Sequence, residues 1–248
     1  DAGFKRVQIG SFVNPKLVPQ MAGTDEVWRL IRRKEEARFS VLVLNERGLR
    51  QALEAGPFHI EMFVSASEAH SMRNSNMGTE TAVLKAADML SRLRNKSISA
   101  TAGVMCAFGC YEDEEVPADK VVDLVRALDG HGPEEIGLAD TAGYGDPNRV
   151  RKLLRAVTRM VDPKRLTLHL HDTRGFGMSN LQTGLEMGIR RFDSSLGGLG
   201  GCPFLPGARG NISTEMTAER LKLLGYGTGL DLHKLLLTSK RIRECVAD

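Results

Sequence analysis

The stretch Leu166-Thr167-Leu168-His169-Leu170-His171 is predicted to form a short β-strand with two distinct faces. Side chains alternate along a strand, so the three leucines take one face while Thr167, His169 and His171 take the other. The two imidazoles therefore stand side by side at the end of the strand, within reach of a single ion. Imidazole binds several divalent metals, and the plainer alternative is a pair of hydrogen-bonded histidines.

Outward from this strand, short β-rich runs alternate with amphipathic helical stretches, and this alternation predicts a parallel sheet with crossover helices. The predicted strands are Lys5–Phe12, Ser40–Leu44, His59–Ser65, Ile98–Ala107, Glu135–Asp140, Leu166–His171 and Arg191–Leu196. The predicted helices are Thr24–Arg33, Glu46–Ala55, Thr79–Leu93, Ala118–Leu128, Pro147–Met160, Met178–Met187, Thr214–Leu224 and Leu230–Cys245.

A chain of 248 residues fits one large α/β barrel or two small domains, and no stretch has the composition of a linker. We therefore expect a single TIM-barrel catalytic domain over residues 1–248. Seven strands are one short of a closed (β/α)₈ barrel. Because Asp1-Ala2-Gly3-Phe4 resembles the tail of a helix, the first β-α unit is expected to be missing from this chain. An open doubly wound sheet is the alternative, but no glycine-rich phosphate loop follows an early strand.

Composition excludes several classes of function. The chain is 42% hydrophobic and 26% charged, with a net charge of +3 and scattered basic residues, so neither nucleic acid nor a membrane is an expected partner. A small anionic substrate fits this balance. The four cysteines lack the spacing of a zinc module, which favours free thiols in a reducing compartment. We expect a cytoplasmic protein, or one of the mitochondrial matrix if a transit peptide was removed.

Further polar residues fall where predicted strands end, the edge at which α/β barrels carry their sites. Asp140 and Thr141 close one strand, and Asp193 lies near the end of the last. Asp140 precedes the histidine strand by one, which favours a role in the site over capping the following helix.

A glycine-rich run follows the last strand: Gly197-Gly198-Leu199-Gly200-Gly201-Cys202-Pro203. Such backbone freedom suits a mobile arm that carries the Cys202 thiol over a substrate as a proton donor or acceptor. An unreactive turn cysteine is the alternative. Asn211 offers an amide oxygen as a hard metal ligand, or it helps to end a turn.

Together these motifs resemble the 3-hydroxy-3-methylglutaryl-CoA lyase family, within the wider group of metal-dependent barrel lyases and acyl-CoA condensing enzymes. The resemblance covers nearly the whole chain, and the glycine loop bearing Cys-Pro discriminates best. The similar segments are Ser11–Met21, Cys106–Cys110, Ala139–Gly143, His169–Thr173, Gly200–Pro203 and Gly207–Asn211.

The resemblance implies roles for individual residues. His169, His171 and Asn211 would bind Mg²⁺ or Mn²⁺. Cys202 would be the catalytic thiol, with Asp140 and His169 close to the reacting atoms. Residues expected to contact the substrate or its CoA part are Arg73, Asn74, Gln8, Thr141, Gly200 and Gly201. The activity implied is cleavage of 3-hydroxy-3-methylglutaryl-CoA into acetyl-CoA and acetoacetate, the chemistry of leucine degradation and ketone body metabolism.

Two departures from the family pattern keep alternatives open. An Arg-Asp pair on the family's first strand would lie ahead of residue 1, and Gln8 stands where the family usually has glutamate. The alternatives are a lyase for a longer-branched 3-hydroxyglutaryl-CoA, a condensing synthase, and a non-catalytic barrel that binds acyl-CoA or metal. The predicted helix Leu230–Cys245 is expected either to cover a barrel end or to meet a partner in a homo-oligomer.

Overall fold

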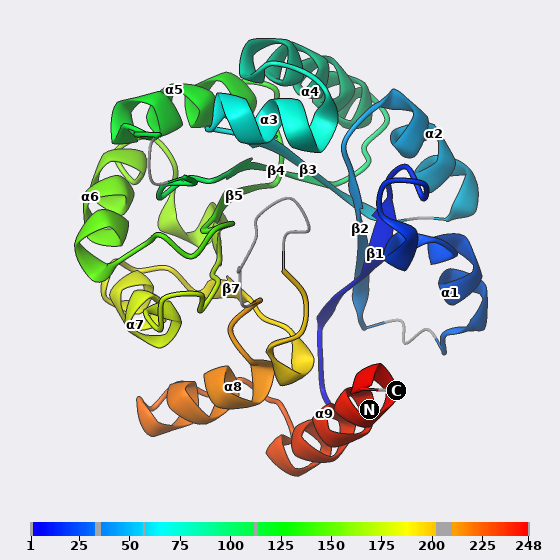
Figure 1. Cartoon of the computed structure of the whole chain (residues 1–248), viewed down its shortest axis with the longest axis vertical. Helices are drawn as coiled ribbons and strands as arrows, with labels where there is room; N and C mark the ends of the chain where they lie inside the picture. The colour runs from blue at the N-terminus through cyan, green and yellow to red at the C-terminus, as the bar shows by residue number, and fades with distance from the viewer. Residues whose placement is uncertain (1, 33–35, 57, 112–113, 202–209, 248) are drawn as a thin grey trace.

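The computed structural model describes residues 2–32, 36–56, 58–111, 114–201 and 210–247. Its described strands form one parallel sheet in which each strand pairs with its neighbour along the chain. The sheet curls around a central axis with helices on its outside (Figure 1). The strands are β1 Arg6–Phe12, β2 Arg38–Val43, β3 His59–Ser65, β4 Ala100–Met105, β5 Glu135–Ala139, β6 Leu166–His169 and β7 Arg191–Asp193.

The helices alternate with the strands as the sequence predicts, with one additional helix, α3 (Glu68–Ser75), after β3. They are α1 Thr24–Leu30, α2 Glu46–Ala55, α3 Glu68–Ser75, α4 Thr79–Asn95, α5 Ala118–Asp129, α6 Pro147–Val157, α7 Gly177–Glu186, α8 Thr214–Leu223 and α9 Leu232–Ala247, with three short 3₁₀ turns at Pro19–Met21, Pro163–Arg165 and Leu196–Gly198. No described helix is long and apolar enough to cross a membrane.

The described sheet has two edges, β1 and β7, and α8 and α9 lie beside the space between them (Figure 1). The backbone N–H of Asp231 donates to the carbonyl of Ala2 at 2.9 Å, which ties the start of α9 to the segment ahead of β1. The fold is therefore the expected α/β barrel architecture with seven described strands and an additional carboxy-terminal helix.

The prediction of elements is confirmed for every strand, with corrections at their ends. β6 ends at His169, and His171 lies beyond it in an antiparallel bridge to Asn211. α1 ends at Leu30, because Ile31 is already extended. Helix α3 was not predicted: its sequence is mostly polar, and its start is marked only by Ser67, whose hydroxyl accepts from the backbone N–H of His70 at 3.0 Å.

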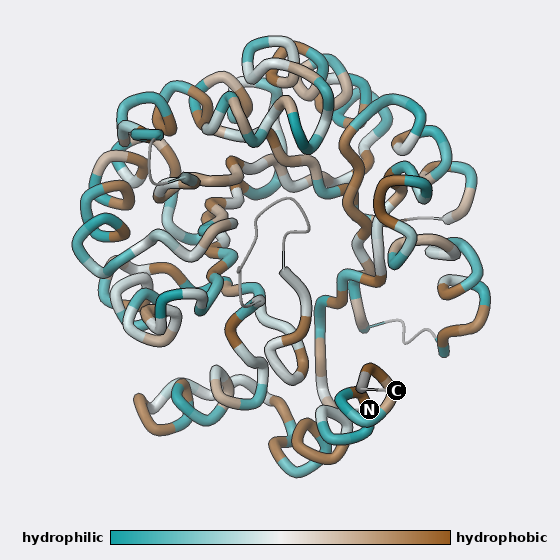
Figure 2. The backbone as a smooth tube through the Cα atoms, in the orientation of Figure 1, coloured by the Kyte–Doolittle hydropathy of each residue, from teal (hydrophilic) through white to brown (hydrophobic). Residues whose placement is uncertain are grey.

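The core lies between the sheet and its helices, and apolar segments alternate with polar ones around the outer ring (Figure 2). Leu166, Leu168 and Leu170 are fully buried on the helix-facing side, as the strand pattern predicts. α6 buries one stripe at helical spacing in the same core: Val150, Leu153, Leu154 and Val157.

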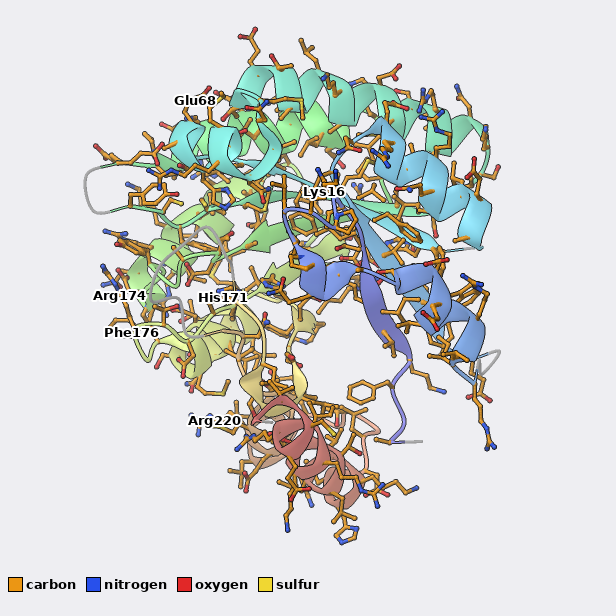
Figure 3. All side chains as sticks on the ribbon, turned by 45° about the vertical axis from the view of Figure 1, so that its right-hand side comes forward. Lys16, Glu68, His171, Arg174, Phe176 and Arg220 are labelled. Carbon is orange, nitrogen blue, oxygen red and sulfur yellow. The ribbon has the colours of Figure 1, made fainter. Side chains whose placement is uncertain are left out.

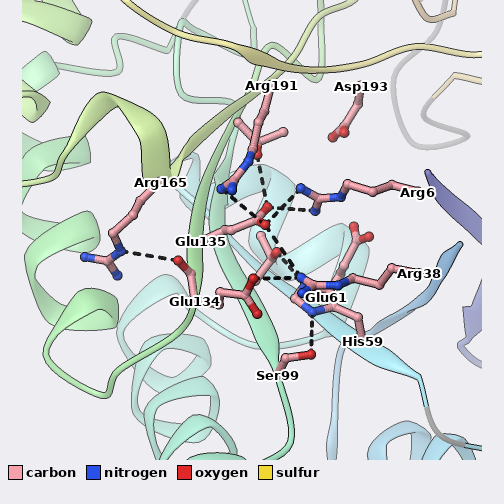
Figure 4. A network of polar contacts seen from close by, with 12 residues as sticks. Arg6, Arg38, His59, Glu61, Ser99, Glu134, Glu135, Arg165, Arg191 and Asp193 are labelled. Atoms are coloured by element: carbon pink, nitrogen blue, oxygen red, sulfur yellow. Dashed lines mark hydrogen bonds and ion pairs between the residues drawn. The ribbon is translucent and has the colours of Figure 1, made fainter. Parts of the chain in front are cut away.

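A charged cluster lies inside the sheet at the amino ends of the strands (Figure 4). Glu135, at the start of β5, is 1% exposed and accepts two hydrogen bonds from the guanidinium of Arg6, at 2.8 and 2.7 Å. Arg191 lies 3.2 Å from the same carboxylate, and Arg38 lies 2.8 Å from the neighbouring Glu134. Burial opposes ionisation of Glu135, but the arginines prevail and lower its pKa. The cluster ties β1, β5 and β7 together across the interior.

Candidate active site

The two imidazoles of the β6 motif face each other at the carboxyl edge of the sheet. Nε2 of His169 lies 3.2 Å from Nε2 of His171, and the ring planes are inclined by 52°. Figure 3 labels His171 together with Arg174 and Phe176, which follow it along the chain. An ion bound by imidazole nitrogens at about 2.0–2.1 Å holds neighbouring donors roughly 3 Å apart. The spacing of these two donors therefore fits a shared ion.

The protonation pattern of His169 is set by Asp193 at the end of β7. Oδ2 of Asp193 lies 3.3 Å from Nδ1 of His169, so an Nδ1–H donates to the carboxylate and leaves the lone pair on Nε2. A carboxylate behind a histidine in this way orients metal-binding imidazoles. Burial opposes protonation of His169, but the hydrogen bond and charge of Asp193 prevail and raise its pKa.

His171 is neutral near pH 7. Its side chain is buried, and burial followed by the nearby His169 lowers its pKa to about 4. Its Nδ1 is buried near the Thr141 backbone without a hydrogen bond of good geometry. A metal ligand must be unprotonated on the bonding nitrogen, and His171 satisfies this condition across the neutral pH range.

Asn211 is brought beside His171 by a segment that extends the sheet beyond β6. The backbone N–H of Ile212 donates to Leu170 at 3.0 Å, and His171 bridges Asn211 in antiparallel fashion. Nδ2 of Asn211 donates to the carbonyl of Leu199 at 3.0 Å, so the amide oxygen stays available. Gly210 allows this approach: its φ is +75°, and a Cβ there would lie 2.1 Å from the carbonyl oxygen of Gly200.

The donor set fits a divalent ion. Among the described residues no three His, Cys, Asp or Glu side chains converge on one point. A metal site here would therefore combine the two imidazoles with the amide oxygen and with ligands from substrate or water. Mixed nitrogen and oxygen donors are acceptable to Mn²⁺ and Mg²⁺.

Asp140 is fully buried next to the pair. Its backbone N–H donates to the carbonyl of His169 at 2.8 Å, and its carboxylate accepts from the N–H of Gly145 at 3.0 and 3.1 Å. Burial raises its pKa to about 6. The alternative interpretation of Asp140 as a helix cap is wrong, because Asp146 caps α6 by accepting from Asn148 and Arg149.

In the structure, the residues expected to contact substrate do not lie together at one point. The hydroxyl of Thr141 accepts from the N–H of Cys106 at 2.9 Å, which occupies it within the protein. Arg73 and Asn74 lie on α3, which follows the carboxyl end of β3, and the Arg73 guanidinium carbon stands 5.0 Å from the centroid of the Tyr111 ring. Gly200 packs against Asn211, with its Cβ position 3.0 Å from Nδ2. Cys202 lies outside the described residues.

Gln8 has a partner that sequence reasoning missed. Its amide donates to Oε2 of Glu61, on β3, at 2.7 Å. Burial, followed by the charge of Asp193, raises the pKa of Glu61 to about 7. The alternation of side chains along β3 could have indicated this contact, because it places Glu61 on the same face as His59 and Phe63. The interior thus holds a carboxylate beside the glutamine.

The chain is similar to known proteins over nearly its whole length. The HMGL-like family matches residues 1–242. A Pseudomonas aeruginosa protein named 3-hydroxy-3-isohexenylglutaryl-CoA/hydroxy-methylglutaryl-CoA lyase is 38% identical over 241 residues, 97% of this chain and 80% of that protein.

Two solved structures extend the similarity to the fold. The HMG-CoA lyase of Brucella melitensis is 38% identical with a TM-score of 0.95, covering 100% of this chain and 88% of that one. An HMG-CoA lyase of A. baumannii, solved with coenzyme A and 3-methylmalate, is 35% identical with a TM-score of 0.93, covering 97% and 79%. The chain belongs to the HMGL-like family.

Proposed function

We propose that this chain is a carbon–carbon lyase that cleaves 3-hydroxy-3-methylglutaryl-CoA into acetyl-CoA and acetoacetate. The observation that carries the proposal is the pair of Nε2 atoms 3.2 Å apart at the carboxyl edge of the sheet, with Asn211 bridged to His171. Relatives named as lyases of this substrate support it, and they favour cleavage over condensation.

His169, His171 and Asn211 are the proposed ligands of a divalent ion, Mg²⁺ or Mn²⁺. When bound, such an ion lowers the pKa of a coordinated hydroxyl and holds a neighbouring carboxylate. Asp193 keeps the lone pair of His169 directed at the ion's position. Asp140, with its pKa raised to about 6, contributes a negative charge or a proton acceptor next to His169.

Cleavage of the bond between C3 and the thioester α-carbon leaves an enolate that must gain a proton. Cys202 is the proposed donor, since a free cysteine thiol ionises at a pH of ~8.5 and exchanges protons readily near neutrality. Gly200 and Gly201 precede it in the sequence. A positioned thiol would protonate the enolate faster than water does.

Arg73 and Asn74 are proposed to contact the CoA part of the substrate. Arg73 is exposed near the end of α3, at the carboxyl edge of the sheet. A guanidinium there can form charge-assisted hydrogen bonds with phosphate. The lyase solved with coenzyme A supports an acyl-CoA ligand for this family. Gln8, with Glu61, and Thr141 are proposed to shape the part of the cavity next to the acyl chain.

The test is turnover by the purified chain. With 3-hydroxy-3-methylglutaryl-CoA and Mn²⁺ or Mg²⁺, we expect acetyl-CoA and acetoacetate in equal amounts, loss of turnover with a chelator, and recovery on adding metal back. Cys202→Ser should lower turnover while leaving Mn²⁺ affinity unchanged. No product from this thioester, with product from a longer-branched 3-hydroxyglutaryl-CoA, would reassign the substrate. Binding of CoA without product from either would refute the catalytic proposal.

A further inference from the structure

Two cysteines that the proposed reaction does not use are in contact beside the site. Cys106 directly follows β4 and Cys110 ends the turn after it; their Sγ atoms lie 2.8 Å apart. Both are free cysteines and both are buried, with 0% and 2% of their surfaces exposed. Cys106 has a φ of +56°, which L-residues seldom adopt. The turn is closed by the N–H of Gly109, which donates to the Cys106 carbonyl at 3.2 Å.

The surroundings make the two sulfurs chemically unequal. The hydrogen bond from the Cys106 thiol lowers the pKa of Cys110. Burial and the charge of Glu114 oppose this change, while the Ser67 side chain and the charge of Arg73 support it. The hydrogen bond between the thiols, together with burial, raises the pKa of Cys106. A thiolate is the nucleophilic form of cysteine, so Cys110 is the attacking sulfur and Cys106 remains a thiol held against it.

We propose that Cys106 and Cys110 form a modification site, a dithiol that hydrogen peroxide converts reversibly into an intrachain disulfide. The Cys110 thiolate attacks one oxygen of the peroxide; the O–O bond breaks, and the leaving hydroxide takes a proton to become water. Cys110 is then a sulfenic acid. The Cys106 sulfur attacks it, the S–O bond breaks, and the thiol proton leaves with the hydroxide as a second water. Two electrons pass from the sulfurs to the peroxide.

The contact between the two sulfur atoms and the burial of both side chains favour disulfide formation by hydrogen peroxide. A disulfide needs sulfurs about 2.05 Å apart, so a small local shift from 2.8 Å is sufficient. Because neither side chain is open to solvent, a small neutral oxidant suits the site better than a bulky disulfide such as oxidised glutathione. The held thiol of Cys106 also intercepts the sulfenic acid before further oxidation.

The pair is linked to the candidate site on two sides. The N–H of Cys106 donates to the hydroxyl of Thr141, the residue after Asp140. Arg73, proposed above as a CoA contact, acts electrostatically on Cys110. Oxidation of Cys110 therefore changes a group that interacts with Arg73.

The experiment is peptide mass analysis of the Cys245→Ser protein, which removes the exposed thiol of α9. The folded protein is treated with hydrogen peroxide and then unfolded in guanidinium chloride so that buried thiols can be alkylated, and it is digested with trypsin. One peptide, residues 97–120, carries both cysteines and neither of the other two. We expect it to lose two hydrogens and resist alkylation, and to regain two alkylation sites after dithiothreitol. Two alkylated thiols after peroxide, or a sulfinic acid on Cys110, would overturn the proposal.

Two matched variants check the assignment of the sulfurs. When the variants are treated with peroxide and then unfolded in the presence of dimedone, Cys106→Ser should show a labelled sulfenic acid at Cys110, whereas Cys110→Ser should leave Cys106 unlabelled. Labelling of Cys106 in the second variant would contradict the assignment of Cys110 as the attacking sulfur. If either variant fails to fold, the result for peptide 97–120 of the parent protein still decides the proposal, and it does so independently of the lyase activity.

Discussion

The two ends of the sheet hold buried polar groups in opposite states. At the amino ends, Glu135 is matched by Arg6 and Arg191, and none of its oxygens lacks a partner. At the carboxyl ends, Nδ1 of His171 is buried without a good hydrogen bond, and two imidazole nitrogens face each other. Unmatched buried polar atoms cost stability. One end therefore stabilises the barrel, and the other keeps donors available for a ligand.

The largest effect is expected from removing an imidazole at the carboxyl end. His171→Ala should lower turnover by about 1,000-fold, because the ion's contribution is worth several kcal/mol and each 1.4 kcal/mol is tenfold. Mn²⁺ titration followed by electron paramagnetic resonance should show the loss of binding. His131→Ala is the control, since that ring bonds Ser91 on the outer helices. Undiminished Mn²⁺ affinity in His171→Ala would place the ion elsewhere.

At the amino end, Glu135→Gln should lower the stability of the fold and leave turnover unchanged. Breaking a buried ion pair costs about 3 kcal/mol, which corresponds to a fall in Tm of roughly 6–12 °C for a chain of this size. Calorimetry measures the shift. Glu186→Gln, which breaks the exposed pair with Arg151, should cost less than about 1 kcal/mol. Loss of turnover in the folded Glu135→Gln protein would show that the amino end of the sheet also takes part in the reaction, and would contradict this account.

A smaller effect on metal affinity is expected at Asp193, which contacts the proposed ligand His169. Asp193→Asn removes the carboxylate that orients His169, and groups in such positions typically affect metal affinity by about 10- to 100-fold. Asp129→Asn, at the partner of Arg165, is the matched change at the other end and should leave Mn²⁺ affinity unaltered. Equal affinities in the two variants would show that Asp193 does not support the site.

The smallest predicted effect is a pH dependence of stability at the amino end. Both nitrogens of His59 are hydrogen-bonded, to Ser99 and Thr101, and burial followed by the charge of Arg38 lowers its pKa to about 4. The unfolded chain takes up the proton near pH 6.5, before the folded one does, so stability falls as pH drops from 6.5 towards 4. By pH 5.5 the loss is about 1 kcal/mol. Urea midpoints should show this slope in the parent protein and a shallower one in His59→Gln; equal slopes would contradict the assignment.

Local pattern predicted the strands and the shared face of His169 and His171, because alternation along a strand is a property of neighbouring residues. It could not predict contacts that close across the barrel. Arg6 and Glu135 are 129 residues apart, and Gln8 meets Glu61 from another strand. Asp193 was recognised as a polar strand end, but its bond to His169 depends on the register of β6 and β7. Helix α3 escaped prediction because its sequence is mostly polar.

The most direct test of the central claim is a crystal structure of the chain grown with Mn²⁺, with the ion located by its anomalous scattering. The account predicts one site bonded by Nε2 of His169, Nε2 of His171 and the amide oxygen of Asn211. An ion held instead by Glu61 or the amino-end carboxylates, with the two imidazoles hydrogen-bonded to each other, would contradict it.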